Sequence, residues 1–504
     1  MSSGGLLRIG IDFESDLAKM SKYERLSSGI EGLDEVLEGG FPAGQAYLAR
    51  GGPGCGKTTL GWHFLTTNLD DGTPRLFISL GESMEQLRRN GAASGFPVDA
   101  VHVLDLSPNA DFFVQNQGYD IFAAAQVEQG PLTERIVEQV SALKPQRVFI
   151  DSMTQLRYLA TDAYQFRQQV VGFLRFLLHQ GATVLFTSEG SQEAPDEDLQ
   201  FISDGILTLQ MQEEGRHVQV SKLRGGTFRK GLHSMRICDR GLVVFPHLVA
   251  VEDPVATAAP RLCPAGIPEI DELLSGGIET GTVTIISGPS GVGKTTLGLQ
   301  FIKEAAGRGD RSVVYLFEEA VDTLLNRCEG INIPVRAMVN RGTLAIFKVD
   351  PLLYSPDEFA HQVRLEVEKA GTQLIMIDSV LGYKLSFKED DLIRNIHGLC
   401  QYLKGRGVTT ILTNEVESIT GDFKATELGV SYLADNIIFL RYLEMRGQMR
   451  RAIGVLKKRL SDFEKTLREF EISRYGIKVG RPLTQLRGIL SGVPEFIKSH
   501  ENEP

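Results

Sequence analysis

The chain has 504 residues, of which 42% are hydrophobic and 23% are charged, and its formal net charge is −11. Because a single hydrophobic core stops growing at roughly 250–300 residues, two or more domains are expected. The acidic balance disfavours a protein whose main task is to grip nucleic acid, and five widely spaced cysteines without a CxxC pair disfavour a disulfide framework or a zinc site.

The N-terminal segment carries acidic residues and has no continuous apolar run, so residues 1–18 are expected to form a tail and not a signal peptide. No apolar run in the chain reaches the roughly 20 residues that a membrane-spanning helix needs. The sequence therefore predicts a cytoplasmic protein without a membrane partner.

The two halves of the chain repeat each other. Leu33–Leu60 aligns without a gap to Ile270–Leu297, at an offset of 237 residues, and about half of the positions are identical. This period is far longer than a solenoid repeat, so it indicates duplication of a whole domain. The expected organisation is a tail (1–18), a first domain (19–247), a Pro- and Ala-bearing linker (248–261), a second domain (262–480) and a C-terminal tail (481–504).

Short apolar runs alternate with helical patterns in the first half. The expected strands are residues 46–51, 75–80, 101–106, 147–152 and 183–189, and the expected helices are residues 58–69 and 166–180. Such alternation predicts an α/β fold in which each domain has a mostly parallel sheet covered by helices.

A glycine-rich loop follows the first expected strand of each half. GGPGCGKT (Gly51–Thr58) and GPSGVGKT (Gly288–Thr295) both fit G-x-x-x-x-G-K-[ST]. In such P-loops backbone amides approach the phosphates, the lysine reaches the β- and γ-phosphates, the hydroxyl binds Mg²⁺, and the next helix offers its positive end. Each half is therefore predicted to bind ATP and Mg²⁺. The expected nucleotide-binding residues are Gly52, Gly54, Cys55, Gly56, Lys57, Thr58 and Thr59 in the first half, and Ser290, Gly291, Val292, Gly293, Lys294, Thr295 and Thr296 in the second. Thr58 and Thr295 are also expected to bind the metal.

Cys55 is open to two interpretations, a redox switch or a small residue tolerated at a variable position.

Acidic residues follow several of the expected strands. Asp151 and Asp378 each end an apolar run, where P-loop enzymes place a carboxylate that holds Mg²⁺. The attacking water needs a carboxylate nearby. Glu318 and Glu319 offer one in the second half, with Glu318 also expected near the metal, whereas the first half offers Glu82. The alternative for each of them is an ordinary solvated carboxylate at a strand end.

A basic element recurs late in both halves. Lys222 and Arg224 have Lys-x-Arg spacing, as do Lys457 and Arg459. Either pair alone could be a solvated basic spot. Recurrence at the same relative place favours cations that reach the γ-phosphate bound by a neighbouring subunit, as an arginine finger does.

This layout resembles the KaiC family of circadian clock ATPases, which have two tandem RecA-like P-loop domains. The resemblance runs from about Tyr23 to Val479, and its closest local match is Tyr432–Arg459. It implies an ATP-dependent homohexamer of two stacked rings with nucleotide between subunits. It also implies slow hydrolysis in the N-terminal ring and serine/threonine autokinase and autophosphatase activity in the C-terminal ring. By the same resemblance, Leu223 and Arg451 join the nucleotide-binding residues.

The sequence departs from the family pattern at several positions. Ser431 and Tyr432 stand where the family has adjacent serine and threonine acceptors, and Thr426 matches a transient acceptor. Ser431 and Thr426 are therefore the expected phosphorylation sites, without an ordered two-site cycle. Gly81 replaces the first of two glutamates, so hydrolysis in the first domain would rest on Glu82. The partners that the resemblance suggests are a KaiB-like protein and a histidine-kinase-type output protein, whereas a KaiA-type activator is not implied.

Two other functions share the same P-loop fold. One is a RecA-like DNA-dependent ATPase or recombinase, which would need a basic DNA path that the acidic chain does not suggest. The other is a nucleotide-gated scaffold with little kinase activity. Binding to single-stranded DNA in the presence of ATP would identify the first, and absence of labelled-phosphate incorporation would identify the second.

Overall fold

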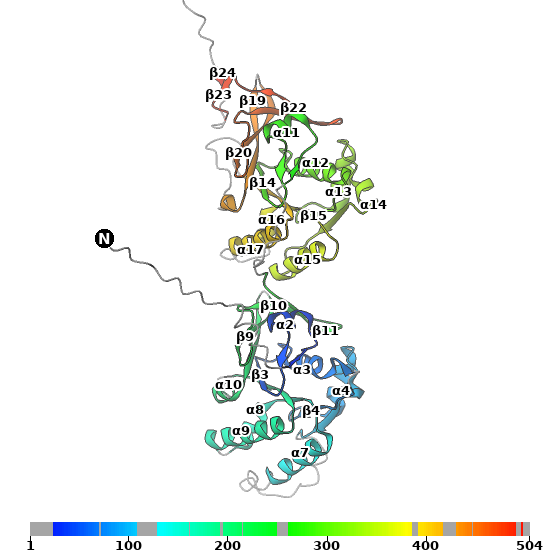
Figure 1. The fold of residues 1–504 in the computed structure, drawn as a ribbon, viewed down its shortest axis with the longest axis vertical. Helices are drawn as coiled ribbons and strands as arrows, with labels where there is room; N and C mark the ends of the chain where they lie inside the picture. The colour runs from blue at the N-terminus through cyan, green and yellow to red at the C-terminus, as the bar shows by residue number, and fades with distance from the viewer. Residues whose placement is uncertain are drawn as a thin grey trace, which may run out of the picture. The chain divides into compact units, whose positions relative to one another are not determined.

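The structure is a computed structural model, and it describes residues 24–69, 72–107, 129–160, 162–191, 195–213, 215–248, 261–385, 392–416, 430–445, 447–489 and 495–496. The chain divides into two compact units, Met1–His247 and Leu248–Pro504. Each unit is built on its own nine-stranded sheet as far as the described residues go (Figure 1). No helix among the described residues is long and apolar enough to cross a membrane.

The first sheet has the strand order β11-β10-β9-β8-β3-β7-β6-β4-β5. The strands from β8 to β5 are paired in parallel, and the β8–β9, β9–β10 and β10–β11 pairs are antiparallel. The strands are β3 (Ala46–Arg50), β4 (Arg75–Ser79), β5 (His102–Asp105), β6 (Arg147–Asp151), β7 (Thr183–Ser188), β8 (Gly205–Gln212), β9 (Gly215–Leu223), β10 (His233–Cys238) and β11 (Gly241–Phe245), and a separate two-stranded sheet joins β1 (Arg25–Leu26) to β2 (Phe41–Pro42).

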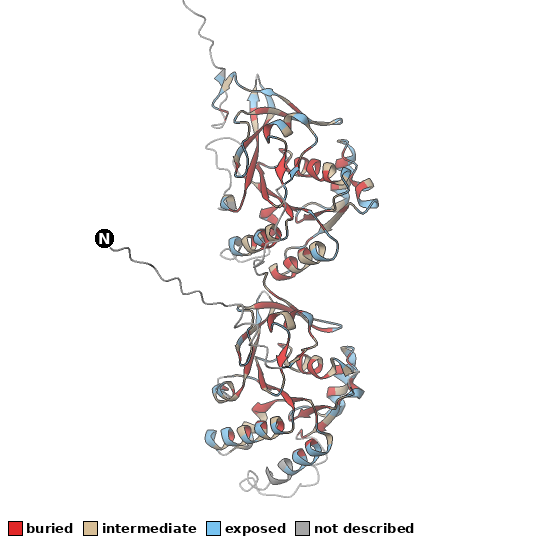
Figure 2. Ribbon diagram, in the orientation of Figure 1, coloured by how far each residue is buried: buried red, intermediate tan, exposed pale blue. Residues whose placement is uncertain are grey.

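Helices cover both faces of the first sheet. They are α2 (Glu31–Val36), α3 (Lys57–Thr66), α4 (Met84–Ala93), α7 (Gln129–Leu143), α8 (Met153–Leu159), α9 (Ala163–His179) and α10 (Glu197–Ile202), with a 3₁₀ turn η2 (Val98–Ala100). Successive strand residues point to opposite faces. Thus Tyr47 of β3 packs in one apolar cluster with Phe64 of α3, and Leu48 packs in the other with Phe166 of α9. Figure 2 shows the buried sheet between its more exposed helices.

The second sheet repeats this arrangement in the order β16-β15-β17-β18-β14-β19-β20-β21-β22. The pairs from β16 to β19 are parallel, and those from β19 to β22 are antiparallel. The strands are β14 (Val283–Gly288), β15 (Ser312–Leu316), β16 (Leu344–Lys348), β17 (Leu374–Asp378), β18 (Thr409–Glu415), β19 (Asn436–Met445), β20 (Gln448–Lys458), β21 (Arg468–Ser473) and β22 (Gly476–Pro482), with small sheets of β12 (Leu262–Cys263) and β13 (Ile278–Glu279) and of β23 (Leu486–Arg487) and β24 (Glu495–Phe496).

The second unit also has helices on both faces of its sheet. They are α11 (Pro268–Leu273), α12 (Lys294–Gly307), α13 (Val321–Glu329), α14 (Val335–Asn340), α15 (Pro356–Glu368), α16 (Val380–Lys384) and α17 (Leu392–Gly405), with a 3₁₀ turn η3 (Val430–Tyr432). Beyond β22, Leu486 and Ile489 pack against Leu443 and Ala452. Part of the expected C-terminal tail is therefore packed on the second unit.

The strand orders place each P-loop at a reversal of the chain's path. β3 lies between β7 and β8, and β14 lies between β18 and β19, so each P-loop leaves the middle of its sheet at the carboxyl end. In open α/β sheets ligands bind at such a switch point. The predicted α/β fold with two mostly parallel sheets is confirmed.

Candidate nucleotide-binding sites

Both P-loops start their helices from the same left-handed backbone. Gly56 has φ 103° directly before α3, and Gly293 has φ 116° directly before α12. At Gly293 the left-handed φ disfavours any side chain, and a Cβ there would also lie 2.5 Å from Cδ1 of Ile472, which would have to move. Each loop thus turns into a helix whose N-terminal amides face an anion site.

The P-loop lysines fold over their own loops. Lys57 Nζ lies 2.7 Å from the Gly51 carbonyl oxygen and 2.8 Å from that of Gly52. Lys294 Nζ lies 2.9 Å from the carbonyl oxygens of both Gly288 and Pro289. Both ammonium groups therefore lie within the loops, where nucleotide phosphates bind in proteins of this kind.

The remaining P-loop residues form three groups. Exposed positions, whose backbone a ligand can approach, are Gly52, Gly54, Ser290 and Gly291. Positions on the first helical turn are Thr58, Thr59, Thr295 and Thr296. Buried positions are Cys55 and Val292. The Cys55 thiol donates to the Gly52 carbonyl at 2.9 Å, and because an apolar valine fills the corresponding place in the second loop, packing accounts for this cysteine.

Each carboxylate that is expected to hold the metal is the last residue of its strand, and that strand lies two places from the P-loop strand in the sheet. Asp151 ends β6, where Thr58 Oγ1 donates to its Oδ2 at 2.6 Å and Thr187 Oγ1 donates to its Oδ1 at 2.5 Å. Asp378 ends β17, and Thr413 Oγ1 donates to its Oδ1 at 2.5 Å. Both carboxylates are therefore oriented by a threonine on the adjacent strand.

Hydroxyl and carboxylate oxygens are ligands that Mg²⁺ accepts. The contact between Thr58 and Asp151 shows that two such oxygens converge beside the first P-loop. Thr295 occupies the same place on α12, although among the described residues it makes no hydrogen bond with Asp378. The described residues hold no cluster of three or more His, Cys, Asp or Glu arranged for a metal. The oxygens of Thr58 and Asp151 fit Mg²⁺ that is shared with nucleotide phosphates.

The two glutamates of the second unit have different partners. Glu318 follows β15, and its Oε1 accepts a hydrogen bond from Ser379 Oγ at 2.6 Å. Ser379 in turn accepts from the Gly382 amide at 3.1 Å. Glu319 forms an ion pair with Arg327 at 2.7 Å. Glu318 is thus held next to Asp378, while Glu319 turns to a cation on α13.

The first unit offers one carboxylate at the corresponding place. Glu82 is an exposed residue. Loss of hydration raises the pKa of its carboxyl, and the Asp151 carboxylate raises that pKa further. A Cβ on the preceding Gly81 would have no neighbour within 4 Å, so the space beside this residue is open. Glu82 therefore shares the surroundings of Asp151 and of the first P-loop.

The Lys-x-Arg elements are held in the same way in both units. Lys222 Nζ donates to the Gln200 carbonyl at 2.9 Å, and Lys457 Nζ donates to the Ala434 carbonyl at 2.7 Å. Loss of hydration lowers the pKa of both lysines, and the neighbouring arginine lowers it further. The residue between the two cations, Leu223 in the first unit, is buried.

Two aspartates that the sequence analysis did not single out bind the arginines of these elements. Arg224 lies 3.2 Å from Asp204, and Arg459 lies 3.6 Å from Asp435. Each aspartate also accepts from the backbone amide of the first residue of β3 or β14. A polar chain therefore runs from each arginine to the strand that leads into the P-loop of the same unit. An aspartate directly before β8 and β19 in both repeats was the available signal.

An arginine from the first antiparallel hairpin lies beside each P-loop. The Arg451 guanidinium is 5.7 Å from the centre of the Tyr442 ring, and the Tyr442 hydroxyl donates to the Ser290 carbonyl at 3.4 Å. In the first unit Arg216 Nε donates to the Gly54 carbonyl at 3.2 Å. Arg216 was not among the expected residues.

The expected phosphate acceptor lies against the Lys-x-Arg element of its own unit. Lys457 Nζ donates to the Ser431 carbonyl at 3.1 Å, and Arg459 Nη2 donates to the Tyr432 carbonyl at 3.3 Å. Ser431 is half-buried and Tyr432 is exposed. Thr426 lies outside the described residues.

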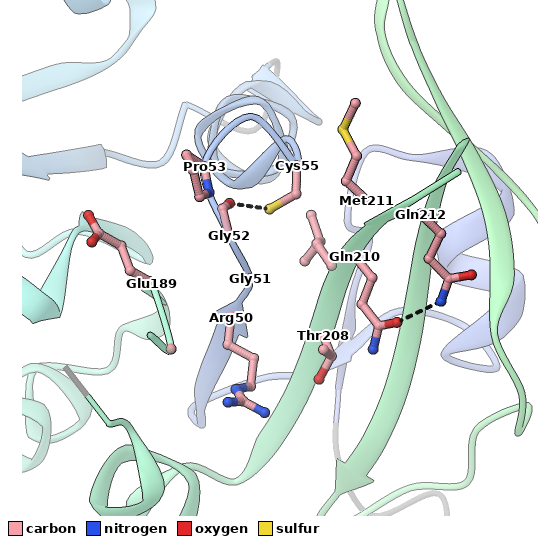
Figure 3. Close-up of a pocket in the computed structure, with 12 residues that line it drawn as sticks. Arg50, Gly51, Gly52, Pro53, Cys55, Glu189, Thr208, Gln210, Met211 and Gln212 are labelled. Carbon is pink, nitrogen blue, oxygen red and sulfur yellow. Dashed lines mark hydrogen bonds between the residues drawn. The ribbon is translucent and has the colours of Figure 1, made fainter. Parts of the chain in front are cut away.

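A cavity of about 490 Å³ opens beside the first P-loop, between the ends of β3, β7 and β8 (Figure 3). Its lining includes Gly51, Gly52 and Cys55, together with Arg50, Glu189 and Gln210. Arg50 is fixed by an ion pair with Asp196 at 2.9 Å. The polar lining residues outside the P-loop have no motif of their own, and only their positions at strand ends could have indicated them.

The fold and these sites define a class: RecA-like P-loop ATPases in tandem, with one nucleotide site per sheet. Comparison with known proteins agrees. The family model of the KaiC ATPase matches residues 26–249 and again residues 263–484. The chain belongs to the KaiC ATPase family.

Several relatives are similar to this chain over nearly its whole length. The chain is 29% identical over 495 residues to "Circadian clock oscillator protein KaiC" of Parasynechococcus marenigrum (strain WH8102), covering 95% of each chain. It is 27% identical over 509 residues to "Circadian clock protein KaiC3" of Synechocystis sp. (strain ATCC 27184 / PCC 6803 / Kazusa), covering 98% of each chain. The described site residues and these relatives together identify an ATP-binding ATPase.

Proposed function

We propose that this chain is an ATP-dependent homohexameric enzyme that hydrolyses ATP and phosphorylates itself on Ser431 of the second unit, with Thr426 as a further acceptor. Removal of that phosphate by the same site is part of the proposal, by resemblance to the family. The proposed role is signalling or circadian-type timing in the cytoplasm. A KaiB-like protein and a histidine-kinase-type output protein are the partners proposed, by resemblance to the family.

One observation carries the kinase proposal. Lys457 and Arg459 donate hydrogen bonds to the carbonyls of Ser431 and Tyr432, so the cation element and the acceptor segment form one surface. If the cations reach ATP on a neighbouring subunit, Ser431 is brought to the same γ-phosphate. On that premise, transfer occurs between subunits and not within one.

The chemistry assigns a role to each second-unit residue. Serine is a weak nucleophile at neutral pH and needs a base. Glu318 takes the Ser431 hydroxyl proton as the bond from Oγ to the γ-phosphorus forms, and the bond from that phosphorus to the ADP oxygen breaks with its electron pair. Glu319 would assist by supporting Glu318. Phosphoryl transfer depends mostly on positioning and charge neutralisation, so Lys294, Lys457 and Arg459 matter as much as the base.

Mg²⁺ bound by Thr295 and Asp378, and by Thr58 and Asp151 in the first unit, would neutralise phosphate charge. Glu318 was also expected near this metal, and its bond to Ser379 keeps it beside Asp378. In the first unit Glu82 orients the attacking water, so that unit hydrolyses ATP without a protein acceptor.

The test is phosphopeptide mapping after incubation with ATP and Mg²⁺. Wild type is expected to carry phosphate at Ser431, Ser431→Ala to lose that signal, and Glu318→Gln to lose most of it. A mixture of catalytically intact Ser431→Ala chains with Glu318→Gln chains should restore phosphate on the latter, because transfer occurs between subunits. Phosphate at neither Ser431 nor Thr426 in wild type would leave the chain as an ATPase without kinase function.

A further inference from the structure

The two P-loop lysines have the same local contacts but a different third partner. Both bind two carbonyl oxygens of their own loop at 2.7–2.9 Å. Lys294 also lies 3.8 Å from the Glu415 carboxylate. Among the described residues Lys57 has no ion pair.

Glu415 is placed by the register of the sheet. It is the last residue of β18 and pairs with Gly288, the first residue of the second P-loop. The Lys294 side chain is only 8% exposed, and that of Glu415 is 30% exposed. Burial lowers the pKa of the Lys294 ammonium, and the carboxylates of Glu415, Asp378 and Glu318 oppose that effect in this order. Lys294 is thus a nearly buried cation whose strongest charged neighbour is Glu415.

Glu189 is the first unit's counterpart. It follows Thr187 and Ser188 as Glu415 follows Thr413 and Asn414, and both threonines orient the metal carboxylate of their unit. Glu189 is exposed and lines the cavity beside the first P-loop (Figure 3). The same residue type at the same place is therefore paired with the lysine in one unit only.

We propose that Glu415 competes with nucleotide phosphates for Lys294 and thereby weakens the binding of ATP and ADP at the second site. Because Lys294 must exchange its carboxylate for phosphate oxygens, part of the binding free energy is spent on breaking this ion pair. No such exchange is needed at Lys57. The inference rests on the proposed function only in assuming that the second P-loop binds nucleotide.

Photo-crosslinking of the full chain with 8-azido-ADP tests this, since peptide mass spectrometry assigns the label to each unit separately. Glu415→Gln should lower the second unit's half-saturation by about three- to tenfold, the range expected for loss of a partly exposed ion pair. Glu415→Asp, which keeps the charge, should lower it less.

Glu189→Gln is the matched comparison, because it removes the corresponding carboxylate where no ion pair with the lysine exists. Its effect on the first unit's half-saturation should be smaller than that of Glu415→Gln on the second. Equal shifts, or an unchanged or weaker second site in Glu415→Gln, would overturn the proposal. Absence of label from the second unit in all variants would overturn the proposed function as well.

Discussion

Single carboxyl groups distinguish the two nucleotide sites. In the second unit Glu318 is held by Ser379, and Glu319 is neutralised by Arg327. In the first unit Glu82 stands alone beside Asp151, and the two carboxylates repel one another when both are charged. The activity of the first site is therefore expected to be sensitive to pH above the ordinary glutamate range.

The first prediction concerns that sensitivity. A general base acts only when it is deprotonated, so a raised pKa moves the loss of activity to higher pH. In Lys294→Ala, which leaves only the first site, ATP hydrolysis should begin to fall on acidification at a pH above the ordinary glutamate range. Glu82→Gln in the same background should reduce the rate by about 10²-fold or more above that pH, and the remaining rate should lack this fall on acidification. A rate that does not depend on Glu82 would assign water activation to another group.

A half-buried histidine gives the second prediction. His63 of α3 accepts a hydrogen bond from the Leu242 amide at 2.7 Å, which requires an unprotonated nitrogen. Burial lowers the pKa of His63 to about 4. A hydrogen bond with the Gly29 backbone raises the pKa by a smaller amount. The unfolded chain therefore binds this proton at higher pH than the folded chain. The first unit should lose about 1 kcal/mol of stability per pH unit as pH falls from about 6.5 to about 4.

Urea unfolding followed by tryptophan fluorescence measures this effect, because the chain's one tryptophan is Trp62, next to His63. His63→Gln retains an acceptor for the Leu242 amide but does not titrate. The difference in stability between the two proteins should shift in favour of the variant as pH falls through that window. A difference that stays constant would show that His63 titrates equally in both states.

At the scale of helices and strands, local patterns were sufficient for the parallel part of each sheet. The expected strand at 46–51 is β3 (Ala46–Arg50), and the expected helix at 166–180 is α9 (Ala163–His179). Buried apolar runs and amphipathic helices are signals carried by the segment itself. The two P-loops and the carboxylates after β6 and β17 could likewise be found from sequence, because each occupies a fixed place in its repeat.

Pairings between distant segments could not be predicted. Glu415 meets Lys294, and Arg216 meets Gly54, only because the sheet places β18 beside β14 and folds β9 back over the P-loop. No spacing in the sequence encodes these contacts. The aspartates that hold Arg224 and Arg459 were overlooked for the same reason, although their recurrence before β8 and β19 was visible.

The third prediction concerns the end of β20. Lys458 lies between the cations of the second Lys-x-Arg element, and its fully buried ammonium pairs with Glu279 at 3.0 Å and donates to the Leu274 carbonyl. The first unit has an apolar residue, Leu223, at the corresponding place. Lys458→Leu leaves Glu279 buried without its cation and should destabilise the second unit by about 3–5 kcal/mol. Lys458→Leu with Glu279→Leu should recover most of that loss.

Two probes separate the units in this experiment. Far-UV circular dichroism reports unfolding of both units, whereas Trp62 fluorescence reports the first. Lys458→Leu should lower the urea midpoint of a transition seen by dichroism and leave the fluorescence midpoint in place. Equal shifts in both probes would mean that the two units unfold as one, and no shift would mean that the buried pair is not formed.

For the whole molecule, the acidic balance and the paired sites favour an ATPase over the alternatives. A net charge of −11 argues against a DNA-dependent recombinase, which would need a basic path. The scaffold alternative remains relevant to the first unit, where Gly81 leaves a single glutamate. Retention of single-stranded DNA by the protein with ATP present would favour the recombinase.

The fourth prediction is that ATP drives assembly. Arg224 and Arg459 are held near the surface by aspartates, with side chains 59% and 49% exposed, so both are accessible to a neighbouring subunit. A ligand that binds between subunits stabilises the assembled state by mass action. Size-exclusion chromatography should give a large particle with ATP and Mg²⁺ and smaller species after their removal. Arg224→Ala should weaken this response, and a monomer under saturating ATP would contradict it.

The final prediction separates the duties of the two units. Lys57→Ala removes the cation for the β- and γ-phosphates from a unit that has one candidate base and no expected acceptor, so its main effect should be on assembly. Lys294→Ala removes the corresponding cation from the unit that contains Glu318 and Ser431, so phosphorylation should fall by about 10²-fold or more while assembly is largely kept. Both variants should be measured by size-exclusion chromatography and by incorporation of labelled phosphate. The ammonium groups of both lysines bond to backbone carbonyls of their own loops, Lys57 also contacts the Cys55 sulfur at 4.0 Å, and Lys294 also pairs with Glu415. Identical defects of the two variants in both measurements would mean that the two sites work as a single unit, and the division of labour would then be wrong.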